Sequence, residues 1–562
     1  MSNNVGLDFG TTYSVISYLR DIRRNASGVI EDFNIAASEP REGGHSPCQD
    51  SIVAVNDNGR IFVGLKARQK VDEDDVRVLK GFKMLLAEKD ASKLEERNYD
   101  GEYTPEKVTK EYISTILDDY ISQNLNGESI DNLVVGVPEI WFSDASTIDC
   151  RTKLEEIIRE NEKVKNVQLV SEPALACAYF TSNYKKNTGR DFVGRLLLID
   201  YGGGTLDVAL CNVKQKGLSS EVSVIKRAGA GTNEKGLGKG GVLFLETVVN
   251  KCLIESGFHS EDIKKNNEYY KCIHDVEEAL MINGDDIKDV FTETDGDKKK
   301  IKERFKTITY DGKKCFVTYG VLAQAYEEAI EDVLKDTLRE ITDYMGENGI
   351  NDNFKIALVG GFCNFYLTQN QIENTPGLKR GGEADEKYSD IIGNRRDCEK
   401  AISFGAALIA NNIIDFKQLS PYTLSIVEAK NESGNEVPGD AMYETILNGM
   451  EIEYGVPVMA KYEDGTEVKF LAERIPFLRV DFGKGMYKCG KPAIPIKLEK
   501  DHVLKLGFSL DHSAIISLHV VDLGRLGQDF DPKAKGTVLP PVRLADIYSM
   551  FGGIIALEEE KK

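Results

Sequence analysis

The chain lacks the residue patterns of several large protein classes. Its ten cysteines form no CxxC pair, and its six histidines show no HExxH or other zinc spacing, so a transition-metal site is not expected. No run reaches the roughly 18–20 apolar residues that a membrane-spanning helix needs. The N-terminus passes from a few polar residues into an apolar strand, without a secretory leader. Scattered thiols in such a chain are typical of reduced core residues, so we expect a cytoplasmic protein that does not act on membranes.

The chain also has fewer basic than acidic residues. Lys and Arg number 71 against 92 for Asp and Glu, which gives a net charge of −21. Nucleic acids and anionic lipids bind basic surfaces, so neither is expected as a partner. With 41% hydrophobic and 29% charged residues in 562 positions, the composition predicts a folded protein of several domains.

Two common nucleotide-binding loops are missing as well. No GxxxxGK[ST] P-loop occurs in the sequence. Gly236, Gly238 and Gly241 fit the spacing GxGxxG, but the residues directly before them are polar. The dinucleotide fingerprint requires a strand at that place, so we reject this match.

The most informative stretch that is present is Leu196–Leu210, LLLIDYGGGTLDVAL. Its apolar residues predict a buried strand that ends at Asp200, and three glycines form the turn before a second strand at Asp207. A glycine turn exposes backbone N–H groups to a phosphate, and the two aspartates are hard oxygen groups suited to Mg²⁺. The alternative interpretation is a glycine-rich hairpin with two solvated aspartates.

The same pattern occurs near the N-terminus in Val5–Tyr18, VGLDFGTTYSVISY. Here Asp8 ends the strand, and Gly10, Thr11 and Thr12 form the turn. A repeat of this kind predicts two related lobes, each of which gives one phosphate-binding hairpin to a shared cleft.

Three further segments contribute candidate residues. Residues 76–87 have apolar positions at helical spacing around Lys83, which on its own would be interpreted as solvated surface. Glu172 is predicted to project from the loop before a helix of small residues. A buried strand, Phe354–Val359, runs into Gly360 and Gly361, a third glycine turn placed to contact a ligand.

The character of the sequence changes after residue 412. A short connector, IIDFKQL, leads into segments in which apolar and polar residues alternate, as in the strands of a β-sandwich. The last forty or so residues are expected to contain at most one short helix, near Val542–Phe551. The alternating segments are Tyr422–Val427, Ile475–Val480, Val503–Leu510 and Ala514–Val521.

These motifs resemble one family. LDFGTTYS, VGVPEIWFSDA, LVSEPALACAYF, IDYGGGTLDVAL, IALVGGF and ISFGAALIA follow the order and approximate spacing of the ATPase domain of 70-kDa heat-shock (DnaK-like) chaperones. IIDFKQLSPYTLSIVE and FSLDHSAIISLHVVD resemble that family's linker and peptide-binding sandwich. The resemblance implies an α/β fold: an actin-like, two-lobed nucleotide-binding domain with duplicated ribonuclease H-like sheets, followed by a β-sandwich.

The resemblance also implies a domain order. The expected parts are lobe I at 1–190 with a small subdomain at about 40–103, lobe II at 191–412 with a small subdomain at about 226–304, a linker at 413–420, the sandwich at 421–525, and a short tail at 526–562 in place of a full helical lid.

By resemblance, the ligands are ATP or ADP with magnesium. Asp8, Asp200 and Asp207 would hold Mg²⁺, largely through water. Lys83 would stabilise the γ-phosphate charge and Glu172 would position the attacking water, since phosphoryl transfer depends mainly on positioning and charge stabilisation. The implied catalytic residues are Lys83, Glu172, Thr205 and Asp207, and the implied nucleotide-binding residues are Gly10, Thr11, Thr12, Tyr13, Gly202, Gly203, Gly204, Thr205, Gly360 and Gly361.

The chain departs from the family's pattern at several positions. Asn364 stands where the family stacks an arginine on adenine, and Thr147 stands where it has an arginine for signalling to the linker. The segment His274–Met281 carries glutamates near the family's purine-binding lysine. A sandwich without the helical lid should exchange peptide quickly.

We therefore consider three functions. The first is a chaperone-type ATPase that couples ATP hydrolysis to binding of extended or unfolded polypeptide, with a J-domain cochaperone or an exchange factor as further candidate partners. The second is a nucleotide-sensing scaffold or regulatory protein with little turnover, and the third is an actin-like filament protein, against which the added sandwich argues.

Overall fold

The computed structural model describes residues 2–562 apart from a set of short segments and one longer one. The segments outside the description are 28–29, 40–46, 72, 74, 87, 144–148, 218, 232–237, 294–299, 351–353, 379–398, 418, 484–485, 492–499, 528–529, 532–534, 545–557 and 560–562. Thr147 and Gly236, singled out above, lie in these segments. The chain forms two compact units: unit 1 is Met1–Ile140 with Glu156–Phe416, and unit 2 is Trp141–Glu155 with Lys417–Lys562.

The first large sheet of unit 1 has the strand order β3-β2-β1-β8-β9, with β4 paired to β2. Its central strand β1 runs antiparallel to β2 and parallel to β8, so that the apolar residues before Asp8 are buried between neighbours on both sides. The strands are β1 (Asn4–Phe9), β2 (Tyr13–Arg24), β3 (Ile30–Ala37), β4 (Gln49–Asp50), β8 (Ile130–Val137) and β9 (Val164–Ser171).

The second large sheet repeats this pairing. Its order is β15-β10-β11-β12-β16, and β10 runs antiparallel to the hairpin strand β11 and parallel to β15. The end of β10 at Asp200 therefore corresponds to the end of β1 at Asp8. The strands are β10 (Val193–Tyr201), β11 (Leu206–Lys216), β12 (Ser219–Ala230), β15 (Phe354–Val359) and β16 (Ile414–Lys417).

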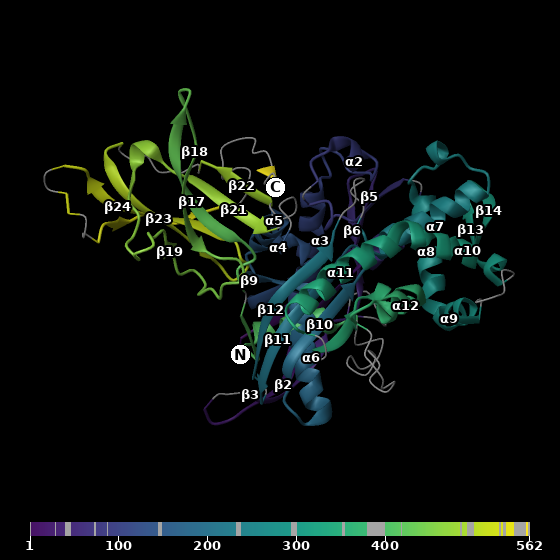
Figure 1. The fold of residues 1–562 in the computed structure, drawn as a ribbon. Coiled ribbons are helices and arrows are strands. Elements are labelled where there is room, and N and C mark those ends of the chain that lie inside the picture. Colours follow the sequence, from purple (N-terminus) through teal and green to yellow (C-terminus); the bar gives the residue numbers. More distant parts are fainter. Residues whose placement is uncertain are drawn as a thin grey trace. The chain divides into compact units, whose positions relative to one another are not determined.

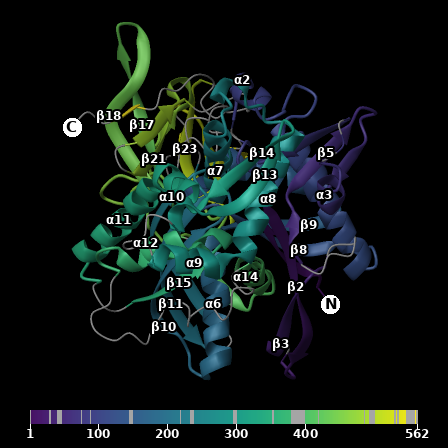
Figure 2. The same cartoon turned by 90° about the vertical axis from the view of Figure 1, so that its right-hand side faces the viewer.

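Two helices of small residues lie between these sheets (Figure 2). Helix α14 (Ala401–Ala410) packs on β1, β2 and β8, and α6 (Glu172–Thr188) packs on β10, β11 and β12. A methyl group on Gly405 would lie 1.8 Å from the Leu175 carbonyl oxygen, and one on Gly6 would lie 2.3 Å from the Ala407 nitrogen. Glycine at these positions thus permits the close approach that brings the two sheets together.

The remaining elements of unit 1 surround the sheets (Figure 1). Helix α3 begins as its sequence predicts, because Thr104 accepts a hydrogen bond from the Lys107 N–H and Pro105 occupies the first helical position. The elements are β5 (Ile52–Asn56), β6 (Ile61–Val63), α1 (Leu65–Arg68), β7 (Val76–Lys80), α2 (Ala91–Glu95), α3 (Pro105–Asn124), α7 (Gly241–Glu255), α8 (Asn267–Ile282), α9 (Gly284–Glu293), β13 (Arg304–Tyr310), β14 (Lys313–Thr318), α10 (Tyr319–Tyr326), α11 (Asp332–Glu347), η4 (Gly361–Asn364) and α12 (Tyr366–Asn374).

The helix predicted over residues 76–87 is wrong. Strand β7 occupies Val76–Lys80 and pairs with β5 in a three-stranded sheet, and Gly81 then ends the strand with a φ of +72°. Two β-branched residues, Val76 and Val78, face the core, where pairing with β5 outweighs the helical spacing of the apolar residues. Lys83 accordingly lies in a turn.

Unit 2 consists of two antiparallel sheets that share one hydrophobic core. The sheet orders are β18-β17-β21-β22-β27 and β19-β23-β24-β25, with β20 added on β23 and β26 on β24. The predicted alternating segments fall on β17, β21, β23 and β24. The strands are β17 (Thr423–Glu432), β18 (Asn435–Ile446), β19 (Val458–Met459), β20 (Phe470–Leu471), β21 (Phe477–Gly483), β22 (Met486–Gly490), β23 (His502–Leu510), β24 (Ile516–Arg525), β25 (Thr537–Val538), β26 (Val542–Arg543) and β27 (Glu558–Glu559).

The expected helix near Val542–Phe551 is wrong at its start. Val542 and Arg543 form β26, because they pair with Leu518 and Ser517 of β24. The rest of that range, from residue 545, lies outside the described residues.

Arg151 fastens the segment Trp141–Glu155 inside unit 2. Its side chain is 1% exposed and donates hydrogen bonds to the backbone oxygens of Trp141 and Ser513 and to the Tyr422 hydroxyl. The guanidinium also lies 4.4 Å from the centre of the Phe142 ring. Helix α4 (Ile140–Ser143), apart from its first residue, and the first residues of α5 (Asp149–Arg159) belong to this segment.

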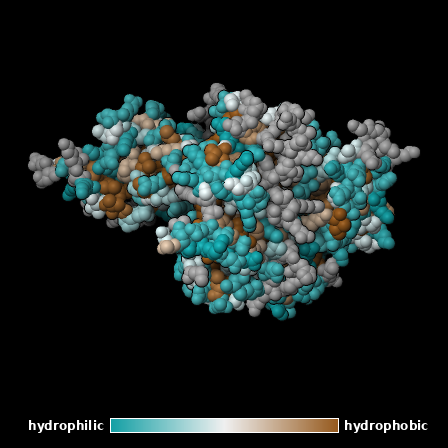
Figure 3. All heavy atoms as spheres, turned by 90° about the horizontal axis from the view of Figure 1, so that it is seen from below, coloured by the Kyte–Doolittle hydropathy of each residue, from teal (hydrophilic) through white to brown (hydrophobic). Residues whose placement is uncertain are grey.

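The surface is largely hydrophilic on the face seen in Figure 3, where apolar residues appear as scattered brown patches. Within the described residues, none of the helices combines the length and the apolar character needed to span a bilayer.

Candidate functional site

A cavity of about 760 Å³ in unit 1 collects the predicted ligand-binding residues. It lies at the carboxyl ends of β1, β10 and β15, where the three glycine turns follow the strands. Asp207 is 0% exposed and does not line it. The other predicted residues do: Asp8, Gly10, Thr11, Thr12, Tyr13, Lys83, Glu172, Asp200, Gly202, Gly203, Gly204, Thr205, Gly360 and Gly361.

The two predicted hairpins face each other at contact distance. A methyl group on Gly203 would lie 2.3 Å from Thr12 Oγ1, and one on Gly204 would lie 2.2 Å from Thr11 Oγ1. Each glycine is therefore needed for the close approach of the opposite threonine. The juxtaposition brings two glycine turns and two threonine side chains to one end of the cavity, and turns of this kind suit a phosphate group.

A fourth glycine segment completes this end of the cavity. The N–H groups of Gly241 and Val242, at the start of α7, donate to the carbonyl oxygens of Gly202 and Gly203 at 3.0 and 2.8 Å. A methyl group on Gly238 would lie 2.3 Å from the Gly204 oxygen. Gly238 and Gly241 of the rejected dinucleotide fingerprint thus pack against the Gly202–Gly204 turn.

Lys83 and Glu172 form a buried ion pair. Lys83 Nζ lies 2.6 Å from Glu172 Oε1, with the two side chains 3% and 7% exposed. Glu172 is the first residue of α6 and not part of the preceding loop, as the sequence had indicated. The pair places one cation and one carboxylate beside the glycine turns, in a region where burial strengthens electrostatic effects.

Three aspartates lie near this pair, of which Asp200 and Asp207 are buried and Asp8 is partly exposed. Burial, and secondly the charge of Glu172, raise the pKa of Asp8 to about 7 and that of Asp207 to about 8, and the same causes raise the pKa of Asp200 well above its usual range. The Lys83 charge opposes these shifts. The Lys83 charge therefore offsets only part of the effect of burial on these carboxyl groups.

The same carboxylates fit a divalent cation. Asp200 Oδ2 and Asp207 Oδ2 are buried without a hydrogen-bond partner, and such oxygens are the ligands that Mg²⁺ prefers. Among the described residues, no three His, Cys, Asp or Glu side chains lie close enough to bind a metal together. The arrangement therefore suits an ion that keeps several water or phosphate ligands.

The raised pKa values predict an unusual dependence of stability on pH. A carboxyl group whose pKa is raised from 3.8 to about 7 or 8 binds more protons in the folded protein than in the unfolded chain between these values. Its contribution to stability is present at acidic pH and is lost as the pH rises through the folded pKa. We expect the ligand-free protein to melt at a higher temperature near pH 5.5 than near pH 8, and we expect this difference to be smaller in Asp8→Asn.

Thermal melts of both proteins at these two pH values test this expectation. The Asp8→Asn variant should show a flatter dependence, because the asparagine does not titrate. Equal pH dependence in the two proteins would contradict the assignment.

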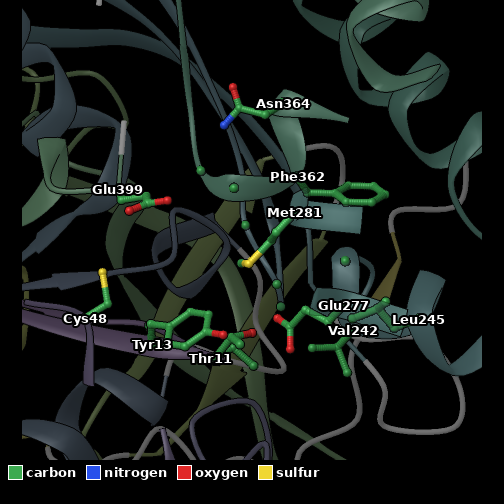
Figure 4. A pocket seen from close by; sticks show the side chains of 18 of the residues that line it. Thr11, Tyr13, Cys48, Val242, Leu245, Glu277, Met281, Phe362, Asn364 and Glu399 are labelled. Carbon is green, nitrogen blue, oxygen red and sulfur yellow. The ribbon is translucent and has the colours of Figure 1, made fainter. Parts of the chain in front are cut away.

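The far end of the cavity, away from Thr11, contains two residues that the departures from the family pattern had singled out, Asn364 and Met281 (Figure 4). Ile287 and Tyr366, which the sequence did not single out, also line the cavity. Elsewhere in the lining, Arg68 pairs with Asp50 at 2.9 Å and donates to the His274 ring. No periodicity or motif marks Arg68, Ile287 and Tyr366, because α1, α9 and α12 reach the cavity only through the tertiary fold.

No family model matches the chain. Individual chaperones do: "Chaperone protein DnaK" from Thermotoga petrophila is 24% identical over 92% of this chain and 78% of its own length, as is that from Thermosipho melanesiensis. The DnaK of Mycoplasmoides gallisepticum is 24% identical over 66% of the chain and 56% of its own length.

Fold and cavity together define a mixed α/β protein of several sheets with a cavity at the strand ends. The similarity to DnaK proteins over 92% of the chain confirms the resemblance seen in the motifs, and at 24% identity it is consistent with a divergent Hsp70-like member. The domain boundaries and the roles of the individual site residues stay predictions.

Proposed function

We propose that this chain is a chaperone-type ATPase that binds and hydrolyses Mg-ATP and couples this cycle to the binding of extended polypeptide. The observation that carries the proposal is the meeting of two glycine turns with the buried Lys83–Glu172 pair at one end of a single cavity. The DnaK relatives raise the expectation of ATPase activity. A cytoplasmic location, without membrane or nucleic-acid partners, is part of the same proposal.

The residues would act mainly by positioning and by charge. Thr11, Thr12 and the glycine turns would bind the phosphates, and Lys83 would stabilise the charge that develops on the γ-phosphate. Glu172 would orient the attacking water, with Thr205 against the transferred group. Asp8, Asp200 and Asp207 would hold Mg²⁺ largely through water, and the ion would supply neutralisation of the phosphate charge when bound.

Exposed apolar side chains of unit 2 support the binding of polypeptide. They follow the β17–β18 hairpin and the segment after it, and an extended chain with alternating apolar residues would cover such a surface. These side chains are Met442, Leu447, Met450, Val456 and Tyr462, which are 39–46% exposed. A J-domain cochaperone or an exchange factor would be a further partner.

Single-turnover hydrolysis of radiolabelled ATP with Mg²⁺ tests the proposal, with and without an unfolded peptide. We expect hydrolysis that the peptide accelerates, with an Asp200→Asn variant as the inactive control. Hydrolysis without any response to peptide would contradict the coupling.

The far end of the cavity favours a second candidate, a nucleotide-sensing scaffold with little turnover. Asn364 and Met281 line this end, Glu277 and Glu278 line the cavity as well, and none of these side chains stacks on a base as a guanidinium does. Tight binding of ATP without turnover would favour the scaffold. An actin-like filament protein would instead sediment when nucleotide is added.

Restoring a cation at this end should strengthen binding. We expect Asn364→Arg to tighten ATP by about tenfold, because an arginine plane over a base contributes about 1–2 kcal/mol when partly desolvated. Calorimetric titration of the variant and of the matched Asn364→Gln control measures the effect. Unchanged affinity in Asn364→Arg would mean that the base is bound elsewhere.

A further inference from the structure

A second buried ion pair lies near Asp207 and outside the cavity lining. Glu139 is 0% exposed, and its Oε1 lies 2.5 Å from Nε of Arg227, which is itself 13% exposed. Glu139 follows Pro138 directly after β8, and Arg227 lies on β12. Neither residue lines the cavity. Burying two charges in this way is costly, so the pair calls for a role beyond general stability.

The pair is connected to Asp207 through one backbone group. The N–H of Ile140, the residue after Glu139, donates to Asp207 Oδ1 at 3.3 Å. The strands reinforce this link, because Asp207 lies opposite Gly229 on β12 and Arg227 is two residues away on the same face. Arg227, which pairs with Glu139, thus lies on β12, the strand that pairs with the strand of Asp207.

Asp207 in turn contacts the cavity through Thr205. The Thr205 side chain lies close enough to the Asp207 carboxyl group to lower its pKa, and Thr205 lines the cavity beside the glycine turn. A displacement of Asp207 would therefore be passed to a group placed against the transferred phosphate. Shifts of about 1 Å at such a point are enough to reduce turnover by about 100-fold.

We propose that Glu139 and Arg227 are positioning residues, which hold the Ile140 N–H on Asp207 and thereby fix Asp207 and Thr205 for phosphoryl transfer. The proposal rests on the ATPase function proposed above. A purely structural role would affect only the stability of the fold. A positioning role affects the geometry of Asp207 and therefore turnover.

Steady-state kinetics of Glu139→Gln test it first. The variant keeps the shape of the side chain but removes its charge. We expect kcat to decrease at least about tenfold while KM for ATP changes less than about threefold, since the pair does not contact the ligand. Glu340→Gln is the matched control: it removes the 2.9 Å pair with Lys226, the residue before Arg227, and should leave turnover unchanged.

A double variant separates positioning from stability. Glu139→Gln with Arg227→Met removes both buried charges, and such replacements restore stability to the fold. If the pair were only structural, turnover would recover together with the melting temperature. A positioning role predicts that turnover of the double variant stays low although its melting temperature recovers. It also predicts that Arg227→Lys, which keeps the charge, retains more turnover than Arg227→Met.

Hydrogen exchange gives a readout that does not depend on activity. We expect the amide of Ile140, followed in peptides that cover residues 138–142, to exchange at least about tenfold faster in Glu139→Gln than in the wild type. Unchanged exchange would overturn the positioning role. A wild type that exchanges slowly but does not hydrolyse ATP would contradict the proposed function and leave the Glu139 link intact.

Discussion

Replacing Lys83 with alanine should reduce ATP turnover by about 1,000-fold. Lys83 is the cation paired with Glu172 beside the glycine turns, and removing a preorganised charge from a water-poor site has effects of this order. The variant should also lose about 3 kcal/mol of stability, because Glu172 would stay buried without its partner. Single-turnover hydrolysis and thermal unfolding measure the two effects separately.

The two effects are separated by a second substitution. Combining Lys83→Ala with Glu172→Gln should recover most of the lost stability, since no uncompensated charge remains, but it should not recover turnover. Turnover near the wild-type rate in Lys83→Ala would show that another group stabilises the transferred phosphate.

Replacing Arg151 with alanine should destabilise unit 2 by about 3 kcal/mol. The substitution leaves the carbonyl oxygens of Trp141 and Ser513 buried without their donor, and it removes the guanidinium from the Phe142 ring. The expected observation is a lower melting temperature of the transition that belongs to unit 2, followed by calorimetry.

Arg543→Ala provides the matched control for Arg151. Arg543 pairs with Glu155 at the end of the same segment, but its side chain is 34% exposed. Pairs that reach solvent contribute about 1 kcal/mol or less, so the change in melting temperature should be small. An equal decrease in melting temperature in the two variants would contradict the proposal that Arg151 connects the segment Trp141–Glu155 to the rest of unit 2.

The glycine turns could be predicted because their signal is local. Asp8 and Asp200 each end an apolar strand and precede a turn, and this order of residues specifies the hairpin without any knowledge of the rest of the chain. Even the facing of the two hairpins follows from the repeat. The repeat does not determine the distance between the two hairpins. Helices α6 and α14 set this distance through their close packing at Gly405 and Gly6.

Lys83 shows where the sequence misleads. The apolar residues around it satisfy a helical period, yet the pairing of β7 with β5 determines the local structure. The role proposed for Lys83 was carried over from the family by position along the chain, so it does not depend on the local secondary structure, and it stays a prediction. Glu139 was passed over for the opposite reason: its partner Arg227 is far away in sequence, and no spacing rule joins them.

The contact between the hairpins has a consequence for how this site can evolve. Thr11 and Thr12 occupy the space that side chains at Gly204 and Gly203 would need. A mutation at either glycine is therefore tolerated only after the opposite threonine has become smaller, although the two segments lie far apart in the gene. The two halves of the site are therefore expected to change together, which would protect both turns from single mutations in a chain that is only 24% identical to its DnaK relatives over 533 residues.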